Sequence, residues 1–375
     1  MRGWGWFLCA TVVVGVACAT SVAQAQDAPS AARVLDSIVL DPLLFDEAFG
    51  GISGVDYDPR QRRWLLLSDD RSEQAPARLY TIGLERLAKG RWRLGKGHRT
   101  LLRDASGRPF LSPGRGREAV DPEAIRVAPD ARSLVWASEG DVQDGYGPSV
   151  RRMDRKGRER GQIRLPSNLR FDRAGQRGPR GNASIEGMDF SPDEALWMAM
   201  EGPLIEDGLA AAEGRPALVR FTRLARDGAA RQFAYRLEAA EAVPNAETVG
   251  NGVSEILAID HRRMLVLERS GAVLGKDRYL FRCRLYLADF SSATEVMGLA
   301  SLKSDVIKPA SKRLLFDFGI LPENPGNLEA MAWWPSRQGR QDQIVLLNDN
   351  NFAPGEPTRL LLLALPKDFA AEAAR

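Results

Sequence analysis

A short stretch of sequence, Ile185-Glu-Gly-Met-Asp-Phe-Ser-Pro192, recurs in related form along the chain. The other copies are Ile52-Ser-Gly-Val-Asp-Tyr-Asp-Pro59, Pro122-Glu-Ala-Ile-Arg-Val-Ala-Pro129, Ser254-Glu-Ile-Leu-Ala-Ile-Asp260 and Leu328-Glu-Ala-Met-Ala-Trp-Trp-Pro335. We align the copies on Ser53, Glu123, Glu186, Glu255 and Glu329, which follow one another at nearly regular intervals. A unit repeated in this way predicts a repeated architecture, and the repeated glutamate predicts a shared polar centre.

Each copy has the pattern of a β-strand that starts a hairpin. In the third copy, Glu186, Met188 and Phe190 fall on one face, while Gly187 and Asp189 fall on the other. A period of two is typical of strands. Turn residues come next, and an apolar run that ends in an acid or amide then pairs back. These runs are Leu65–Asp70, Leu134–Glu139, Leu196–Glu201, Leu265–Glu268 and Ile344–Asn350.

Two more strand-like runs follow in most units, so that each unit has four. The fifth unit stops after Arg359–Leu363, whereas the N-terminal region has a spare strand at Val34–Leu40. We therefore predict an all-β fold, a β-propeller of four-stranded blades whose ring is closed by the N-terminal strand. Five blades are counted, and a sixth stays open if the stretch 269–328 contains a degenerate blade. The alternative is an open array of β-sheets.

The N-terminus has the features of an export signal. Arg2 precedes an apolar run from Trp6 to Ala19, which is shorter than the roughly 20 residues that span a bilayer, and Ala23-Gln-Ala25 has the pattern of a cleavage site. We expect residues 1–25 to be a signal peptide and residues 26–375 to be one domain. The protein is then periplasmic or secreted, without a membrane span; a membrane anchor is the alternative.

Charge and cysteine content narrow the classes of partner. Cleavage of the signal leaves Cys283 as the remaining cysteine, so no disulfide forms within the domain. The net charge is +3, and the densest basic run, Arg151 to Arg160, has the pattern of a solvated hairpin face. No basic stripe with interleaved aromatic residues is present, so we expect no nucleic-acid partner. We expect a monomer.

The sequence argues against a site built on histidine, because His98 and His261 are far apart in the sequence and neither has a second histidine nearby. Zinc sites built on imidazole and Ser-His-Asp triads therefore do not fit the sequence. The carboxylates are the main alternative. In a propeller, Glu123, Glu186, Glu255 and Glu329 return around one axis, where they repel one another unless protons, arginines or a cation compensate. They are our candidate metal ligands, and oxygen ligands favour Ca²⁺ or Mg²⁺. Alternatively, each glutamate binds a neighbouring blade.

A second layer of polar residues follows the second strand of each unit. Because hairpin strands run in opposite directions, these residues return beside the repeated glutamates. Asp69 and Asp349 are our candidate general bases. Arg71 and Arg269 follow acids at what the alignment takes as corresponding places, and they are candidates to bind a substrate anion or to pair internally.

Several of these motifs together resemble the phytase-like family, which is also described as having esterase-like activity of phytase. The motifs are Gly51-Ile-Ser-Gly54, Glu186-Gly-Met-Asp-Phe190, Ala199-Met-Glu-Gly-Pro203, Asn327-Leu-Glu-Ala-Met331 and Asn348-Asp-Asn350, and the resemblance covers about residues 34–366. It implies an exported bacterial β-propeller that hydrolyses phosphoesters or esters, with Ca²⁺ as the expected cofactor. The chain lacks the lysine-rich site of true propeller phytases, so phytate is not the expected substrate.

Three functions remain open at this stage. The first is a hydrolase in which a divalent cation at the propeller mouth assists attack on a small anionic ester. The second is a non-catalytic propeller that binds a ligand or a partner on its rim. The third is a sugar-lactone hydrolase that resembles the gluconolactonase type.

Overall fold

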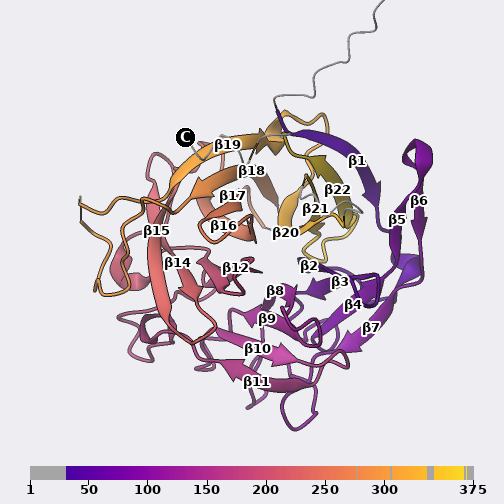
Figure 1. The fold of residues 1–375 in the computed structure, drawn as a ribbon, viewed down its shortest axis with the longest axis horizontal. Coiled ribbons are helices and arrows are strands. Elements are labelled where there is room, and N and C mark those ends of the chain that lie inside the picture. The colour runs from indigo at the N-terminus through magenta and orange to yellow at the C-terminus, as the bar shows by residue number, and fades with distance from the viewer. Residues whose placement is uncertain (1–30, 277, 305, 336–341, 367–368, 370–375) are drawn as a thin grey trace, which may run out of the picture.

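The computed structural model describes residues 31–276, 278–304, 306–335, 342–366 and 369, and within them the chain forms a five-bladed β-propeller (Figure 1). The blades, each written from the innermost strand outward, surround a central axis. They are β2 (Ile52–Asp58), β3 (Arg63–Ser68), β4 (Arg78–Ile82) and β7 (His98–Leu101); β8 (Pro122–Val127), β9 (Leu134–Ser138), β10 (Ser149–Met153) and β11 (Glu159–Ile163); β12 (Ile185–Phe190), β13 (Leu196–Met200), β14 (Ala217–Leu224) and β15 (Ala230–Leu237); β16 (Thr248–Ala258), β17 (Arg263–Val273), β18 (Tyr279–Asp289) and β19 (Ser311–Asp317); and β20 (Asn327–Trp333), β21 (Gln343–Asp349), β22 (Arg359–Ala364) and β1 (Arg33–Val39).

The N-terminal strand closes the ring, as predicted. Strand β1 pairs antiparallel with β22, so that Ile38 lies opposite Leu360. A further hairpin of β5 (Leu84–Arg86) and β6 (Trp92–Leu94) extends from the first blade. From it, Arg86 Nε and Trp92 Nε1 donate to Asp36 Oδ2 on β1 at 3.1 and 3.0 Å. The first blade therefore holds the strand that completes the fifth.

The stretch 269–328 does not hide a sixth blade in its described part. It supplies the outer strands of the fourth blade and a long excursion between β18 and β19. This excursion crosses to the third blade, where Arg220 Nη1 donates to the carbonyl of Val296 at 2.9 Å. The remaining elements are short 3-10 helices. They span Pro42–Leu44, Ala88–Gly90, Ser167–Leu169, Ile205–Asp207 and Phe318–Ile320.

The core lies between neighbouring blades. Trp64, Trp136 and Trp197 lie on the second strands of the first three blades, and all three are almost fully buried. On the axis itself, the guanidinium of Arg126 contacts every blade. It donates to the carbonyls of the residues Val55, Ile125, Ile256 and Met331 and to the carboxylate of Asp189. A buried cation thus joins the innermost strands, with hydrogen bonds satisfying its donors.

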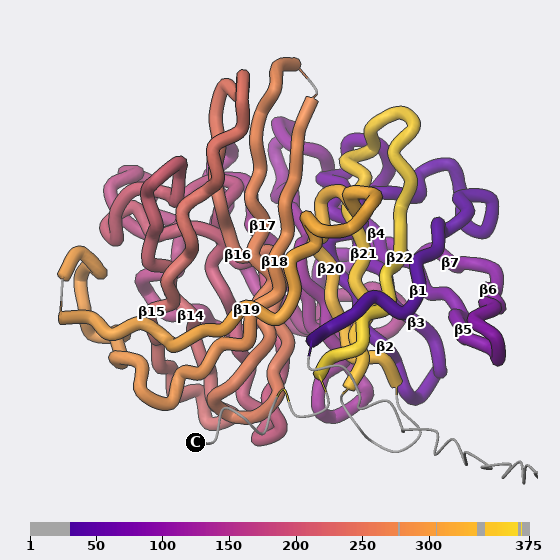
Figure 2. Tube along the Cα trace, turned by 90° about the horizontal axis from the view of Figure 1, so that it is seen from above, coloured from indigo at the N-terminus to yellow at the C-terminus, as the bar shows by residue number. Residues whose placement is uncertain are grey.

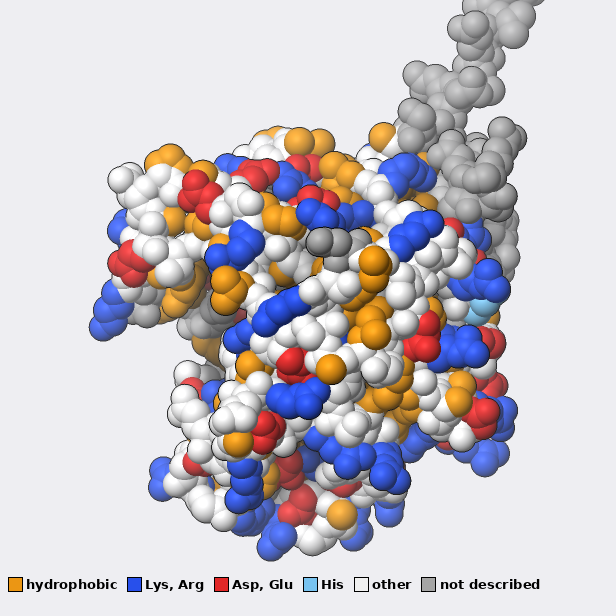
Figure 3. All heavy atoms as spheres, turned by 90° about the vertical axis from the view of Figure 1, so that its left-hand side faces the viewer, with side chains coloured by type: hydrophobic (Ala, Val, Ile, Leu, Met, Phe, Trp, Pro, Cys, Tyr) orange, Lys and Arg blue, Asp and Glu red, His pale blue; other side chains and the backbone are white. Residues whose placement is uncertain are grey.

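Seen from the side, the propeller has two rims, at which the strands end and loops connect them (Figure 2). Strands β16, β17 and β18 have 11 residues each and are longer than the inner strands of the other blades, so their hairpin rises above one rim. On the face shown in Figure 3, lysine and arginine side chains are interspersed with acidic ones. Among the described residues, no helix is long and apolar enough to cross a membrane.

Candidate metal centre at the propeller mouth

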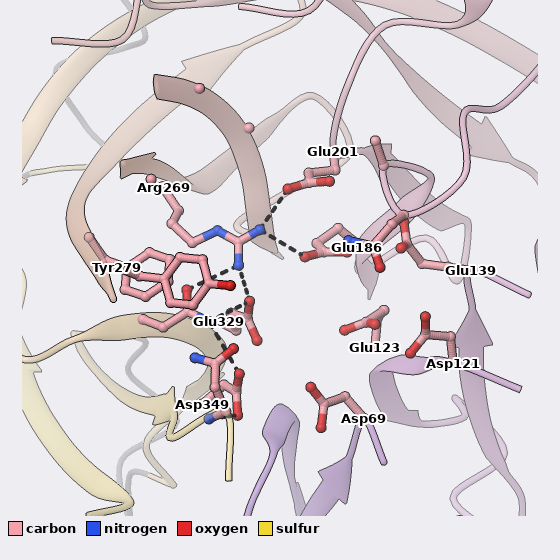
Figure 4. Close-up of a pocket in the computed structure, with 18 of the residues that line it drawn as sticks. Asp69, Asp121, Glu123, Glu139, Glu186, Glu201, Arg269, Tyr279, Glu329 and Asp349 are labelled. Atoms are coloured by element: carbon pink, nitrogen blue, oxygen red, sulfur yellow. Dashed lines mark hydrogen bonds and ion pairs between the residues drawn. The ribbon is translucent and has the colours of Figure 1, made fainter. Parts of the chain in front are cut away.

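A cavity of about 590 Å³ opens at the rim where the second strands of the blades end, and we call this opening the mouth. Figure 4 shows carboxylates from several blades pointing into it. The acidic side chains that line it are Asp69, Asp70, Glu73, Asp121, Glu123, Glu139, Glu186, Glu201, Glu329 and Asp349, together with Arg71 and Arg269. The structure therefore gathers acids from distant parts of the chain around one space.

A β-bulge in each inner strand sets the lower layer of the mouth, and three of the bulge residues, Glu123, Glu186 and Glu329, line the cavity. The register between the two inner strands shifts between Ile52 and Gly54, and a corresponding shift occurs in every other blade; in the second blade it spans both Glu123 and Ala124. A bulge leaves one extra residue unpaired and redirects its side chain. The residues at the bulges are Ser53, Glu123, Glu186, Ser254 and Glu329.

The structure does not bring Glu255 to the mouth with the other aligned glutamates. In the fourth blade the bulge falls on Ser254, so our alignment is shifted there by one residue. A shift of one residue turns a strand side chain to the opposite face. Glu255 instead points toward the axis, where its carboxylate lies 2.8 Å from Arg126 Nη2 and accepts the backbone N–H of Met188 at 3.0 Å. For Glu255, the alternative that the glutamate binds neighbouring blades describes the geometry.

The upper layer consists of the residues that follow the second strands. Register places Arg269 opposite Gly252 and Asp349 opposite Asn327, and the backbone N–H of Asp69 bonds the carbonyl of Gly51 in the same way. The upper-layer residues are Asp69, Glu139, Glu201, Arg269 and Asp349. The fourth blade thus contributes an arginine where every other blade contributes an acid.

Arg269 and Arg71 do not occupy corresponding places, contrary to our alignment. Arg269 Nη2 lies 2.6 Å from Glu201 and 3.5 Å from Glu186, and its Nη1 pairs with Glu329. It therefore links acids of two other blades. Arg71 lies outside this ring, one-third exposed, with nitrogens 3.7 Å from Asp121 and 3.3 Å from Asp141.

Within the described residues, three groups of carboxylates have oxygens close enough to share a cation, since the oxygens of each group lie within 4.8 Å of one another. The groups are Asp69 with Glu329 and Asp349, Asp121 with Glu123 and Glu139, and Glu139 with Glu186 and Glu201. Sequence reasoning noticed Glu139 and Glu201 as strand-end acids but did not select them as ligands, and it missed Asp121. The signal for Asp121 was its position directly before the inner strand, in Asp121-Pro-Glu123.

Comparison with known families agrees with this architecture. The model of the family described as "Phytase-like: Esterase-like activity of phytase" matches residues 47–352, which is well over half of the chain. The chain belongs to the phytase-like family. The match spans the four complete blades and ends before β22, so the two strands that close the ring lie outside it. No curated protein matches the chain.

Burial and mutual repulsion govern the protonation of this phytase-like mouth. Burial, followed by the repulsion of neighbouring acids, raises the pKa of Asp69 and of Glu123 well above the usual range. Burial also raises the pKa of Asp121 to about 7, although Arg71 opposes it, and that of Asp349 to about 7. The site therefore takes up protons unless another positive charge replaces them.

The hydrogen bonds show which carboxylates of the mouth have a donor or a positive charge beside them and which do not. Glu329 accepts from Ser53 Oγ at 3.0 Å and from Asn327 Nδ2 at 2.9 Å, besides its pair with Arg269. By contrast, Asp69 Oδ1 is buried without a hydrogen-bond partner among the described residues. A buried carboxylate oxygen without a donor is costly. Oxygen-rich groups with such an atom fit a hard divalent cation such as Ca²⁺.

Proposed function

We propose that this protein is an exported phytase-like hydrolase that cleaves a phosphoester or carboxylic ester at its acidic mouth with the help of a divalent cation, Ca²⁺ being the first choice. The observation that carries this proposal is the set of three adjoining carboxylate groups in one open cavity. Membership in the phytase-like family supports hydrolysis, and the features of residues 1–25 support export to the periplasm or medium.

We propose Asp121, Glu123 and Glu139 as the principal cation ligands, with Glu186 and Glu329 as further ligands. Burial and the neighbouring acids Glu186 and Asp121 raise the pKa of Glu123, so a cation beside Glu123 would relieve this repulsion. When bound, the cation polarises an ester or phosphoryl oxygen and lowers the pKa of water. It also offsets the negative charge that would repel an anionic substrate.

Asp69 and Asp349 are the proposed general bases, since both point into the cavity and neither belongs to the group of Asp121, Glu123 and Glu139 proposed as the principal cation site (Figure 4). A pKa near 7, as at Asp349, suits proton transfer at neutral pH. We assign Arg71 to the substrate, because its side chain lines the cavity, is one-third exposed, and lies 3.7 and 3.3 Å from its carboxylate partners Asp121 and Asp141. Arg269 already pairs with three carboxylates, those of Glu186, Glu201 and Glu329, so we assign it the role of positioning these acids.

The test is hydrolysis of 4-nitrophenyl phosphate, 4-nitrophenyl acetate and a sugar lactone with calcium or chelator. We expect turnover of at least one substrate with calcium, its loss with chelator, and a fall of at least about 100-fold in Glu123→Gln. Glu85→Gln, which changes an exposed acid on the β5–β6 hairpin, is the matched control. Calcium binding without turnover of any substrate would instead indicate a binding propeller. Turnover that chelator leaves unchanged would contradict the role of the cation.

A further inference from the structure

The wall of the mouth formed by the fourth blade differs from the acidic floor. Here β17 and β18 continue beyond Arg269, and the side chains of Tyr279 and Phe281 face the cavity. The two rings stack with centroids 6.0 Å apart and an angle of 21° between their planes. Tyr279 is 54% exposed, so much of its side chain is open to solvent. Tyr279 lines the same cavity as Glu329 and Arg269, and all three are labelled in Figure 4.

Two glycines keep the surface beside these rings clear. Gly250 and Gly271 lie opposite each other on β16 and β17, and Gly271 lies opposite Phe281 on β18. Neither glycine has a positive φ, and an added Cβ would lie 3.7 Å from its nearest neighbour at Gly250 and 3.5 Å at Gly271, both ordinary contacts. Neither packing nor backbone conformation therefore requires glycine here. Glycine inside a strand weakens it and commonly marks close approach of a ligand.

We infer that Tyr279, Phe281 and the strip formed by Gly250 and Gly271 bind a six-membered ring, aromatic or sugar, carried by the substrate. This inference rests on the proposed function for the assignment of the ring to an ester. An aromatic side chain offers a face for stacking without a charge, which suits a site whose other lining is strongly acidic. The substrate class is then an ester whose ring lies on the fourth blade while its reacting bond reaches the acids.

Binding of neutral probes tests the ring site without hydrolysis or a cation. Saturation-transfer NMR compares 2-phenylethanol with hexan-1-ol, and methyl glucoside with the open-chain glucitol. In one of the two pairs, we expect the probe that contains a ring to bind about five to ten times more tightly than the probe that lacks it. A preference within the first pair would indicate that the site binds an aromatic ring, and a preference within the second pair would indicate that it binds a sugar ring. Equal binding within both pairs would overturn the inference.

Variants localise the effect. Tyr279→Ala should abolish the ring preference, whereas Tyr279→Phe should retain it because stacking needs the ring and not the hydroxyl. Gly271→Val should also abolish the preference by filling the strip, and its melting temperature should stay close to that of the wild type. A ring preference that survives both Tyr279→Ala and Gly271→Val would place the ring elsewhere and overturn the assignment.

A kinetic comparison separates this inference from the proposed function. The substrates are 2-phenylethyl phosphate and n-hexyl phosphate, whose leaving groups have similar basicity, and glucose 6-phosphate with glucitol 6-phosphate. We expect the ring-bearing member of the pair preferred in NMR to have a several-fold lower KM, and Tyr279→Ala to raise that KM with little change in kcat. If no phosphate is turned over but the NMR preference holds, the ring site stands and phosphoester hydrolysis fails.

Discussion

A single arginine, Arg269, gives the mouth its asymmetry. It occupies the position at which the other blades place an acid, and it contacts Glu186, Glu201 and Glu329. Burial opposes its charge, but the acids around it raise the pKa of its guanidinium overall. We regard Arg269 as the fixed counter-charge of the site, and a cation as the exchangeable one.

Replacing Arg269 should therefore expose the repulsion between these acids. We predict that Arg269→Met lowers the free energy of unfolding by about 3 kcal/mol in chelator at pH 8, the usual loss when one partner of a buried pair is removed. The loss should shrink at pH 5, because burial raises the pKa of Glu186 and of Glu201 and so favours their uncharged forms as the pH falls. Urea denaturation of the wild type, Arg269→Met and the exposed-site control Arg93→Met measures it. An equal loss at both pH values would mean that Arg269 acts through packing.

At the scale of elements, folding of the ring depends on β1, which completes the fifth blade by pairing with β22. Its absence would expose the edge of β22, and an unpaired apolar edge invites aggregation. We predict that a chain beginning at Leu40 fails to give soluble protein, whereas a chain beginning at Ala31 folds with the melting temperature of the longer form. Expression of both forms and size-exclusion chromatography provide the measurement. A soluble, stable chain without β1 would show that closure is dispensable.

Sequence patterns predicted the elements better than the site. Alternation and spacing were sufficient for four strands per blade and for closure by Val34–Leu40, since both follow from which faces are buried. The bulge on Ser254 was not predictable, because Ser254 and Glu255 are both polar and the register depends on pairing with β17. Asp121 was missed because it precedes the strand, and Tyr279 because only the fold places it at the mouth.

At the scale of the molecule, the buried acids make stability depend on pH. In the unfolded chain Asp121 and Asp349 have pKa values near 3.8, and folding raises each to about 7. Their folded forms thus hold protons more tightly, so stability is fully present below about pH 4 and is lost as the pH rises through about 7. With chelator present, we predict that the melting temperature falls between pH 5 and pH 8. Asp121→Asn should reduce this slope, and an opposite slope would contradict the assigned directions.

The proposed chemistry rests on binding of a divalent cation at the mouth, in exchange for protons held by the acids whose pKa burial raises. The decisive measurement is calorimetric titration of calcium into chelator-treated protein at about pH 7, in two buffers of different ionisation enthalpy. We expect a saturable binding heat with release of protons, weakened at least about tenfold in Glu123→Gln and unchanged in Glu85→Gln. Absence of saturable heat, or equal binding by Glu123→Gln and the wild type, would refute a cation site at the mouth.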